Sequence, residues 1–314
     1  MNIPQDIVIR YIKTKNKVRK IVTYRSDDCK LRAYHNKINN FLNENFLNSI
    51  FAKAYIAKQS IYKNAKAHMY NDYFIMMDVQ NFFNSINHNN LVEKLYLELN
   101  RINENNITKK ECMDIVNNCS INKVGIPLGF ITSPILSNIY LKEFDGILYG
   151  KLKKLELENV IYTRYADDIC ISFKDNALNQ EKEAEIISLT NCLLKRYRLK
   201  LNTNKTRSYN LKATNHVKIT GVNIVKSADD YRTLSVGKKI KNALFWDAIN
   251  CYKKTNRTSD EIDKIKGMQS FVLSVEKNGY ESCYSGNMMA EVKKQGFDSL
   301  KELIDNLSAN INNL

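Results

Sequence analysis

The chain of 314 residues is long enough to form two or three lobes around a hydrophobic core. Its 44% hydrophobic and 26% charged residues exclude a disordered or fibrous protein. No apolar run approaches the roughly 20 residues that a membrane span requires, the N-terminus lacks the layout of a secretion signal, and the seven cysteines are scattered without C-x-x-C spacing. We therefore expect a cytoplasmic protein with no membrane association and no structural zinc.

The net charge of +15 is unevenly distributed along the chain. Residues 1–70 hold 14 basic and 4 acidic residues, and residues 190–257 hold 16 basic and 3 acidic residues. The rest of the chain is therefore net acidic. Two basic regions on either side of a more acidic centre favour binding of a polyanion, with carboxylates available for chemistry. A protein that is basic only for solubility is the alternative.

The elements predicted in chain order are helices, then a sheet backed by helices, then a helical tail. Three prolines and ten glycines leave few breaks, so most of the chain is expected to be helical. The predicted elements are a helical segment over 36–70, a buried strand over 73–79, a helix over 135–149 opened by Thr132-Ser133-Pro134, strands over 160–165 and 169–173, a helix over 176–198, short strands within 218–225 and 231–236, and a helical tail from 238 with an apolar stripe of Leu300, Ile304, Leu307 and Ile311.

Three carboxylates stand at the ends of the predicted central strands. Asp78 ends one apolar strand, and Asp167 and Asp168 occupy the turn of a later hairpin. A carboxylate at such a place is costly unless it is solvated, paired or bound to a cation. Oxygen ligands suit Mg²⁺, and two such ions can stabilise both the attacking and the leaving oxygen of a phosphoryl transfer. An isolated Asp-Asp pair is more often a simple turn dipeptide, so the surrounding sequence decides.

Four segments resemble the motifs of reverse transcriptases, in the order in which that family has them. Thr163–Asp168 (TRYADD) resembles the Y-x-D-D catalytic hairpin, and Met77–Ile86 (MDVQNFFNSI) resembles the first catalytic motif. Gly125–Pro134 (GIPLGFITSP) resembles the motif that lies against template and incoming nucleotide. Leu199–Arg207 (LKLNTNKTR) resembles the later segment whose lysine lies near the leaving pyrophosphate. The resemblance covers most of residues 15–235.

This resemblance implies a right-hand polymerase of the α+β class, with an antiparallel palm sheet backed by helices and a helical thumb. It predicts that Asp78 and Asp167 are the main ligands of two Mg²⁺ ions, with Asp168 as a third carboxylate and the carbonyl of Val79 assisting. Lys205 is expected to protonate the leaving pyrophosphate or to offset its charge. We expect N-terminal helices and fingers over 1–70, the palm with a fingers insertion over 71–234, and an RNA-binding thumb over 235–314.

The resemblance also implies how nucleotides are held. Phe83 matches the bulky gate beneath the sugar, which leaves no room for a 2′-hydroxyl and selects deoxynucleotides; Phe82 is the more obvious core residue. Lys17 and Arg19 resemble the fingers residues that hold the triphosphate, although the whole N-terminal stretch is basic.

One position departs from the family pattern. Reverse transcriptases usually have Pro-Gln-Gly where this chain has Pro127, Leu128 and Gly129. Leucine can only pack, so nucleotide handling at this position is expected to differ.

Two shorter segments narrow the resemblance to retron reverse transcriptases. Asn64–His68 (NAKAH) matches their N-A-x-x-H signature, and Lys218–Val222 (KITGV) resembles their V-T-G motif. A retron enzyme copies part of a structured non-coding RNA into a short single-stranded DNA, starting from the 2′-hydroxyl of a guanosine in that RNA. Retrons commonly act in anti-phage defence with an effector, or toxin, protein. The resemblance therefore implies as partners a cognate RNA, the RNA–DNA hybrid product, deoxynucleotides and an effector.

Recognition of a folded RNA depends on phosphate, 2′-hydroxyl and shape contacts. Tyr231 and Tyr252 could stack on unpaired bases, whereas Phe245 and Trp246 are expected in the thumb core. The alternative function is a defence-associated, abortive-infection reverse transcriptase that makes DNA without a dedicated RNA. The predicted RNA-binding residues are Asn64, His68, Lys238, Lys239, Lys241, Lys253, Lys254 and Arg257.

Overall fold

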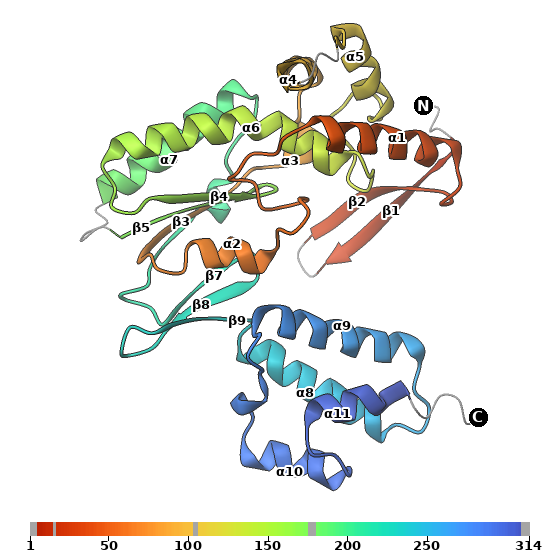
Figure 1. Cartoon of the computed structure of the whole chain (residues 1–314), viewed down its shortest axis with the longest axis vertical. Helices are drawn as coiled ribbons and strands as arrows, with labels where there is room; N and C mark the ends of the chain where they lie inside the picture. The colour runs from red at the N-terminus through yellow and green to blue at the C-terminus, as the bar shows by residue number, and fades with distance from the viewer. Residues whose placement is uncertain (1–4, 15–16, 103–105, 175–179, 309–314) are drawn as a thin grey trace. The chain divides into compact units, whose positions relative to one another are not determined.

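The computed structural model of the chain describes residues 5–14, 17–102, 106–174 and 180–308, and shows an α+β protein (Figure 1). It divides into two compact units, one of residues 1–60 with 70–210 and one of residues 61–69 with 211–314. The domain boundaries expected from the sequence lie elsewhere, after residues 70 and 234. Within the described ranges, no helix combines the length and the apolar character that a membrane crossing needs.

The first unit contains a two-stranded ribbon, a four-stranded antiparallel sheet and several helices. The strands are β1 (Ile7–Thr14), β2 (Lys17–Tyr24), β3 (Tyr73–Asp78), β4 (Ile161–Tyr165), β5 (Asp168–Phe173) and β6 (Arg207–Asn210). The helices are α1 (Lys30–Asn45), α3 (Phe82–Ser85), α4 (His88–Ile102), α5 (Lys109–Asn118), α6 (Ser133–Leu152) and α7 (Gln180–Arg196).

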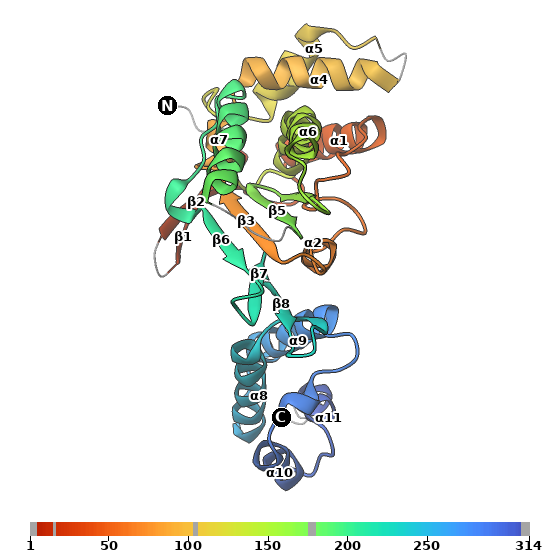
Figure 2. The same ribbon diagram turned by 90° about the vertical axis from the view of Figure 1, so that its left-hand side faces the viewer.

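The four-stranded sheet, in the order β4-β5-β3-β6, has one face covered by helices α6 and α7 (Figure 2). Side chains alternate between the two faces of a strand. Ile75 and Met77 of β3 and Ile169 and Ile171 of β5 therefore face the helices, where they join the main hydrophobic core. Asp78 and Asp168 have the opposite parity, so they project from the other face of the sheet.

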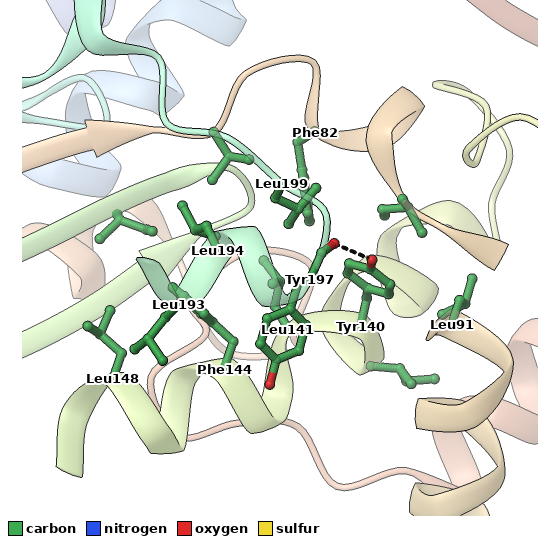
Figure 3. Close-up of a cluster of buried hydrophobic side chains, with 14 of the residues drawn as sticks. Phe82, Leu91, Tyr140, Leu141, Phe144, Leu148, Leu193, Leu194, Tyr197 and Leu199 are labelled. Atoms are coloured by element: carbon green, nitrogen blue, oxygen red, sulfur yellow. Dashed lines mark hydrogen bonds between the residues drawn. The ribbon is translucent and has the colours of Figure 1, made fainter. Parts of the chain in front are cut away.

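Helix α6 is the centre of this core. Every residue from 135 to 141 is buried, whereas Glu143, Gly146 and Gly150 in its second half are exposed. Pro134 stands in its first turn, where a missing N–H is tolerated. Figure 3 shows its side chains packed against α7 and α3, with the Tyr140 hydroxyl donating to the Tyr197 carbonyl at 2.6 Å. This packing covers one face of the sheet with helices, and the carboxylates project from the other face.

The second unit combines a small sheet with a helical region. Helix α2 packs on the three-stranded sheet, which is why residues 61–69 belong here rather than with the N-terminal elements. The elements are α2 (Ile61–Ala67), β7 (His216–Ile219), β8 (Val222–Lys226), β9 (Arg232–Ser235), α8 (Lys238–Lys253), α9 (Ser259–Val275), α10 (Gly286–Lys294) and α11 (Leu300–Asp305).

Most of the predicted elements are confirmed, with two corrections. The chain begins with a β-ribbon rather than helices, because residues 7–24 are rich in β-branched side chains. The predicted helix over 36–70 is interrupted at 46–60, where Ala52 forms a parallel bridge with Arg164 at the edge of β4. In the C-terminal stripe, Leu300, Ile304 and Leu307 are buried as predicted, and Ile311 lies outside the described residues.

Candidate active site

The three predicted carboxylates come together where β3 ends and β5 begins. Asp78 and Asp168 are register partners on these neighbouring strands. Asp167 lies in the tight turn before β5, and its carbonyl accepts a hydrogen bond from the Val79 amide at 3.0 Å. The turn is closed by Ala166 in a left-handed conformation, with φ of 58°. The sequence motif thus forms the expected hairpin, with its carboxylates beside the end of β3.

Lys205 and Asn202 hold the Asp78 carboxylate. The ammonium of Lys205 donates to Asp78 Oδ2 at 2.6 Å, and the Asn202 amide donates to Oδ1 at 3.1 Å. The bond to Asp78 raises the pKa of Lys205, so this side chain stays charged. Asn202 lies within the LKLNTNKTR segment, but the sequence analysis assigned it no role. Its backbone amide also donates to the Asp78 carbonyl at 2.7 Å.

Negative charge accumulates at this edge of the sheet. Asp168 is exposed as a residue, but partial desolvation of its carboxyl group raises its pKa to about 6. The like charges of Asp167 and Asp78 raise this pKa further, whereas Lys205 opposes the rise. Repulsion of this kind is what a bound cation would relieve.

The donor chemistry of the site fits a hard divalent cation. The carboxylates supply only oxygen ligands, which suit Mg²⁺. Across the described ranges, however, no three His, Cys, Asp or Glu side chains are grouped closely enough to hold one ion. The Asp78 carboxylate is directed to Lys205 and Asn202 instead. The site therefore has the right donors, with a lysine offsetting part of their charge.

Phe82 and Phe83 differ in their burial, and the role of Phe83 as a gate stays a prediction. Both lie on the short helix α3, and their rings meet edge to face with centroids 5.3 Å apart. Phe82 is buried in the core, while Phe83 is only partly buried. Gly125 fixes the backbone here, since a Cβ at this glycine would lie 2.4 Å from the Phe83 carbonyl. The Ile126 amide donates to the same carbonyl at 2.9 Å.

The loop after Gly125 is clamped onto the N-terminal ribbon. The Val22 amide of β2 donates to the Leu128 carbonyl at 2.8 Å. A Cβ at Gly129, whose φ is +108°, would lie 2.2 Å from the Val22 carbonyl, so only glycine fits. Lys17 and Arg19 lie on β2, but their side chains are outside the part of the chain that the structure describes.

Comparison with known proteins agrees with this geometry. The sequence model of the family "Reverse transcriptase (RNA-dependent DNA polymerase)" matches residues 12–224, a range that contains the carboxylates, Phe83 and the loop after Gly125. The chain belongs to the reverse transcriptase family. The α+β polymerase fold expected from the sequence is thereby confirmed.

Several relatives of this reverse transcriptase are retron enzymes of Escherichia coli. The chain is 34% identical to retron Ec73 reverse transcriptase over 117 residues, which are 36% of this chain and 37% of that protein. It is 25% identical to retron Ec83 reverse transcriptase over 249 residues, which are 75% and 74% of the two proteins. A third, retron Ec86 reverse transcriptase, is 26% identical over 71% of this chain and 62% of its own length. The resemblance to retron-type reverse transcriptases is thus confirmed.

Among solved structures, apo telomerase from Candida Tropicalis is similar, with a TM-score of 0.49 and 13% identity. That match covers 96% of this chain and 62% of the telomerase chain.

The two short retron motifs of this reverse transcriptase meet in the second unit. The Asn64 amide donates to the Thr220 hydroxyl at 3.1 Å, which joins N-A-x-x-H to the I-T-G segment. Thr220 and Gly221 both have positive φ, so the segment forms a tight turn. Asn64 and His68 are both buried, and the Asn64 Oδ1 atom is buried without a hydrogen-bond partner. Both residues are thus enclosed by the second unit, and an RNA contact by either stays a prediction.

The predicted RNA-binding cations of the second unit differ in their surroundings. Lys238 and Lys239 are exposed at the start of α8. Lys241 is buried and forms an ion pair with Glu276 at 2.9 Å. The remaining three also have partners within the unit: Lys253 pairs with Glu291, Lys254 pairs with Glu261, and Arg257 lies over the Tyr252 ring.

The aromatic residues of α8 are divided in the same way. Phe245 is fully buried, as predicted, but the prediction for Trp246 is wrong because 48% of this residue is exposed. The helix turns the two neighbours to different sides, and Trp246 shares its exposed face with Lys239 and Lys253. Tyr231, before β9, is also exposed. These residues are among the accessible aromatic and basic groups of this region.

Proposed function

We propose that this protein is a retron reverse transcriptase, an RNA-directed DNA polymerase that transfers deoxynucleotides to a growing DNA strand. The observation that carries the proposal is the pairing of Asp78 with Asp168 across two strands, with Asp167 in the adjoining turn. The retron relatives support it, although the matched segment is only 37% of one of them and 74% of another.

In this proposal the three carboxylates and the Val79 carbonyl hold two Mg²⁺ ions. When bound, such ions stabilise the attacking and leaving oxygens of a phosphoryl transfer. Lys205 offsets charge rather than donating a proton, because its raised pKa moves it away from the neutral range that suits a general acid. In this proposal the positive charge of Lys205, beside Asp78, offsets the charge of the leaving pyrophosphate.

The substrates in this proposal are deoxynucleoside triphosphates. Phe83 is the gate that excludes the 2′-hydroxyl, supported by its partly buried ring above Phe82. Lys17 and Arg19 bind the triphosphate from β2. Leu128 and Gly129 bind the nucleotide through packing and backbone groups, because leucine has no side-chain amide to offer.

The template in this proposal is a cognate structured non-coding RNA, copied into short single-stranded DNA from a 2′-hydroxyl of that RNA. The exposed face of α8, with Lys239, Trp246 and Lys253, contacts the RNA or the RNA–DNA hybrid. Cations attract the phosphates, and an exposed indole can stack on a base. A cytoplasmic location and a role in anti-phage defence with an effector protein follow from the retron assignment alone.

The catalytic part of the proposal is tested by replacing Asp167 and Asp168 with asparagine together. DNA synthesis should be abolished while RNA affinity is retained. The matched control changes the other exposed Asp-Asp pair of this unit, Asp27 and Asp28, to asparagine, and should leave synthesis intact. Undiminished synthesis by the Asp167/Asp168 variant would refute the assignment of the site.

The retron part is tested on nucleic acid that co-purifies with the protein expressed from its native locus. The sample is treated with ribonuclease and debranching enzyme, and the remaining DNA is sized and sequenced. A discrete short DNA whose 5′ end is freed by debranching is the expected result. Heterogeneous DNA, or DNA attached to the protein, would instead establish the abortive-infection type of enzyme, and Leu128 would be the first residue to study.

A further inference from the structure

A buried polar cluster lies behind the catalytic hairpin, on the helix side of the sheet. Arg164 of β4 is fully buried, and its Nε and Nη2 atoms donate to the two oxygens of Asp145 at 2.8 and 2.9 Å. The Tyr162 hydroxyl donates to the same carboxylate at 2.6 Å, and Arg164 Nη1 donates to Asn138 Oδ1 at 3.2 Å. Both Asp145 and Asn138 are buried residues of α6.

Stability alone does not explain this cluster. Apolar residues of similar size often stabilise a core as well as a buried ion pair does, because removing two charges from water is costly. Burial by itself would lower the pKa of Arg164, but the Asp145 carboxylate outweighs that effect and raises it, so the guanidinium stays charged. The cluster instead fixes geometry, since a bidentate pair holds the guanidinium in one orientation.

The cluster binds two backbone carbonyls that belong to strained turns. Arg164 Nη1 donates to the carbonyl of Ala166 at 3.3 Å, directly before Asp167. The Asn138 amide donates to the carbonyl of Ala54 at 3.1 Å, directly before Tyr55. Ala166 has a φ of 58° and Tyr55 a φ of 63°. Left-handed conformations of non-glycine residues persist only where the surroundings hold them.

The segment before Tyr55 is also attached to β4 by its backbone. The Arg164 amide donates to the Phe51 carbonyl at 2.9 Å, and the Lys53 amide donates to the Arg164 carbonyl at 2.8 Å. Arg164 therefore holds the turn at Ala166 through its side chain. It holds the turn at Tyr55 through its main chain and through Asn138.

Tyr55 extends from its turn toward the gate. Half of this residue is exposed, and its ring meets the Phe83 ring edge to face, with centroids 6.5 Å apart and an interplanar angle of 70°. Burial raises the pKa of Tyr55, and the charge of Asp167 raises it further, so the hydroxyl lies within electrostatic range of the carboxylates. Tyr55 thus contacts Phe83, and its turn shares the Asn138–Arg164 cluster with the turn before Asp167.

We propose that Asn138 and Arg164 are positioning residues that hold Tyr55 against Phe83 at a fixed place relative to Asp167, and that Tyr55 is thereby a second determinant of sugar selection. This inference rests on the proposed polymerase function. Loss of the Asn138–Ala54 bond releases the Tyr55 turn, so the Phe83 ring loses its contact with the Tyr55 ring. The 2′-hydroxyl of a ribonucleotide is then excluded less strictly.

The test measures kcat and KM for single additions of a deoxynucleotide and of the matching ribonucleotide on an RNA template. Asn138→Ala removes the bonds of Asn138 to the Ala54 carbonyl, to Asn48 and to Arg164. It should raise the ribonucleotide share of kcat/KM about fivefold, which is the effect expected from losing the Ala54 bond alone. The change should appear mainly in the KM for the ribonucleotide. Tyr55→Ala, at a half-exposed position where folding is not at risk, should have a similar effect.

The matched control is Asn71→Ala. Asn71 is equally buried and donates to the Asn159 carbonyl at 3.0 Å and to the Ser172 hydroxyl at 2.8 Å. It lies just before β3, at the opposite end of the β3–β5 pair from Asp78. Asn71→Ala should lower the melting temperature yet leave the nucleotide ratio unchanged.

An unchanged ratio in Tyr55→Ala, or an equal change in Asn138→Ala and Asn71→Ala, overturns the inference even where Asn138→Ala folds poorly. If the wild-type protein makes no DNA on any RNA template, the proposed function fails and this inference fails with it. Activity of the wild type with unchanged selectivity in the variants refutes the inference alone.

Discussion

Replacing Gly125 with alanine is the sharpest single test of how the gate is held. Gly125 has a φ of +52°, a conformation that side chains rarely adopt. The added Cβ would lie 2.4 Å from the Phe83 carbonyl oxygen, 2.6 Å from Asn84 Cα and 2.7 Å from the Asn84 carbonyl carbon. All three atoms belong to the backbone of α3 or its carbonyls, so no flexible side chain can move aside. The turn and the helix must separate.

The size of the effect follows from these contacts. Ordinary contacts of a Cβ begin near 3.4 Å, so the two backbone segments must separate by about 1 Å. The left-handed conformation costs alanine about 1 kcal/mol. Separation also breaks the 2.9 Å bond from the Ile126 amide to the Phe83 carbonyl, worth about 1 kcal/mol. We therefore expect a loss of about 2 kcal/mol in the free energy of unfolding, together with displacement of Phe83.

Two assays check this expectation. Chemical denaturation gives the change in unfolding free energy, and single-nucleotide addition gives the ratio of ribonucleotide to deoxynucleotide incorporation, which should rise. Gly146→Ala is the control, because that glycine lies within α6 with no atom within 4 Å of an added Cβ. It should stabilise the protein by about 0.5–1 kcal/mol without changing selectivity. Unaltered stability and selectivity in Gly125→Ala would refute the reasoning.

Three further predictions concern other parts of the chain. Phe83→Ala should admit ribonucleotides with little loss of deoxynucleotide incorporation, measured by single additions; unchanged discrimination would place the gate elsewhere. Lys241→Met should lower the free energy of unfolding by about 2 kcal/mol, because the Glu276 carboxylate loses its ion-pair partner and keeps only the hydrogen bonds from the Ser235 hydroxyl and the Val236 amide. At temperatures where the protein is folded its RNA affinity should match wild type, whereas exposed Lys239→Ala should weaken binding. Burial lowers the pKa of His35, so the folded protein keeps it neutral while the unfolded chain, with its ordinary value near 6.5, takes up a proton. Stability should therefore fall as the pH decreases below about 6.5, by at most about 1.4 kcal/mol per unit, and His35→Gln should reduce that slope in denaturation at pH 5 to 7.

The catalytic part of the fold could be predicted because its signals are local. A run of apolar residues ending in Asp78, and two β-prone runs separated by three residues, define strands and a hairpin without reference to the rest of the chain. The family motifs then assign the carboxylates. The structure adds the register, which pairs Asp78 with Asp168 and so explains why these two residues share one face of the sheet.

Contacts between distant segments were out of reach of the same reasoning. Residues 46–60 follow a helical pattern and yet leave the helix, because the edge of β4 offers backbone hydrogen bonds that only the folded sheet provides. Helix α2 similarly packs on strands that follow it by about 150 residues. Lys241 belongs to the same lysine-rich segment as the exposed Lys238 and Lys239, and only its ion pair with Glu276 distinguishes it from them. In each case the deciding partner is remote in sequence.

The positioning cluster does leave one trace in the sequence, although the trace alone does not reveal its role. Asn138 and Asp145 are buried polar residues of α6, and seven residues, or about two turns, separate them. They therefore lie on the same buried side of the helix, where each must find a hydrogen-bonding partner. In the sequence, Arg164 is the candidate for that partner. Arg164 is the register partner of Ile169, so its side chain lies on the same face of the sheet as Ile169 and Ile171, toward the helices. Asp168 projects from the opposite face. A buried arginine such as Arg164 is costly unless it is paired. Because its partners are Asn138 and Asp145, Arg164 connects α6, on one face of the sheet, with the turn that carries Asp167.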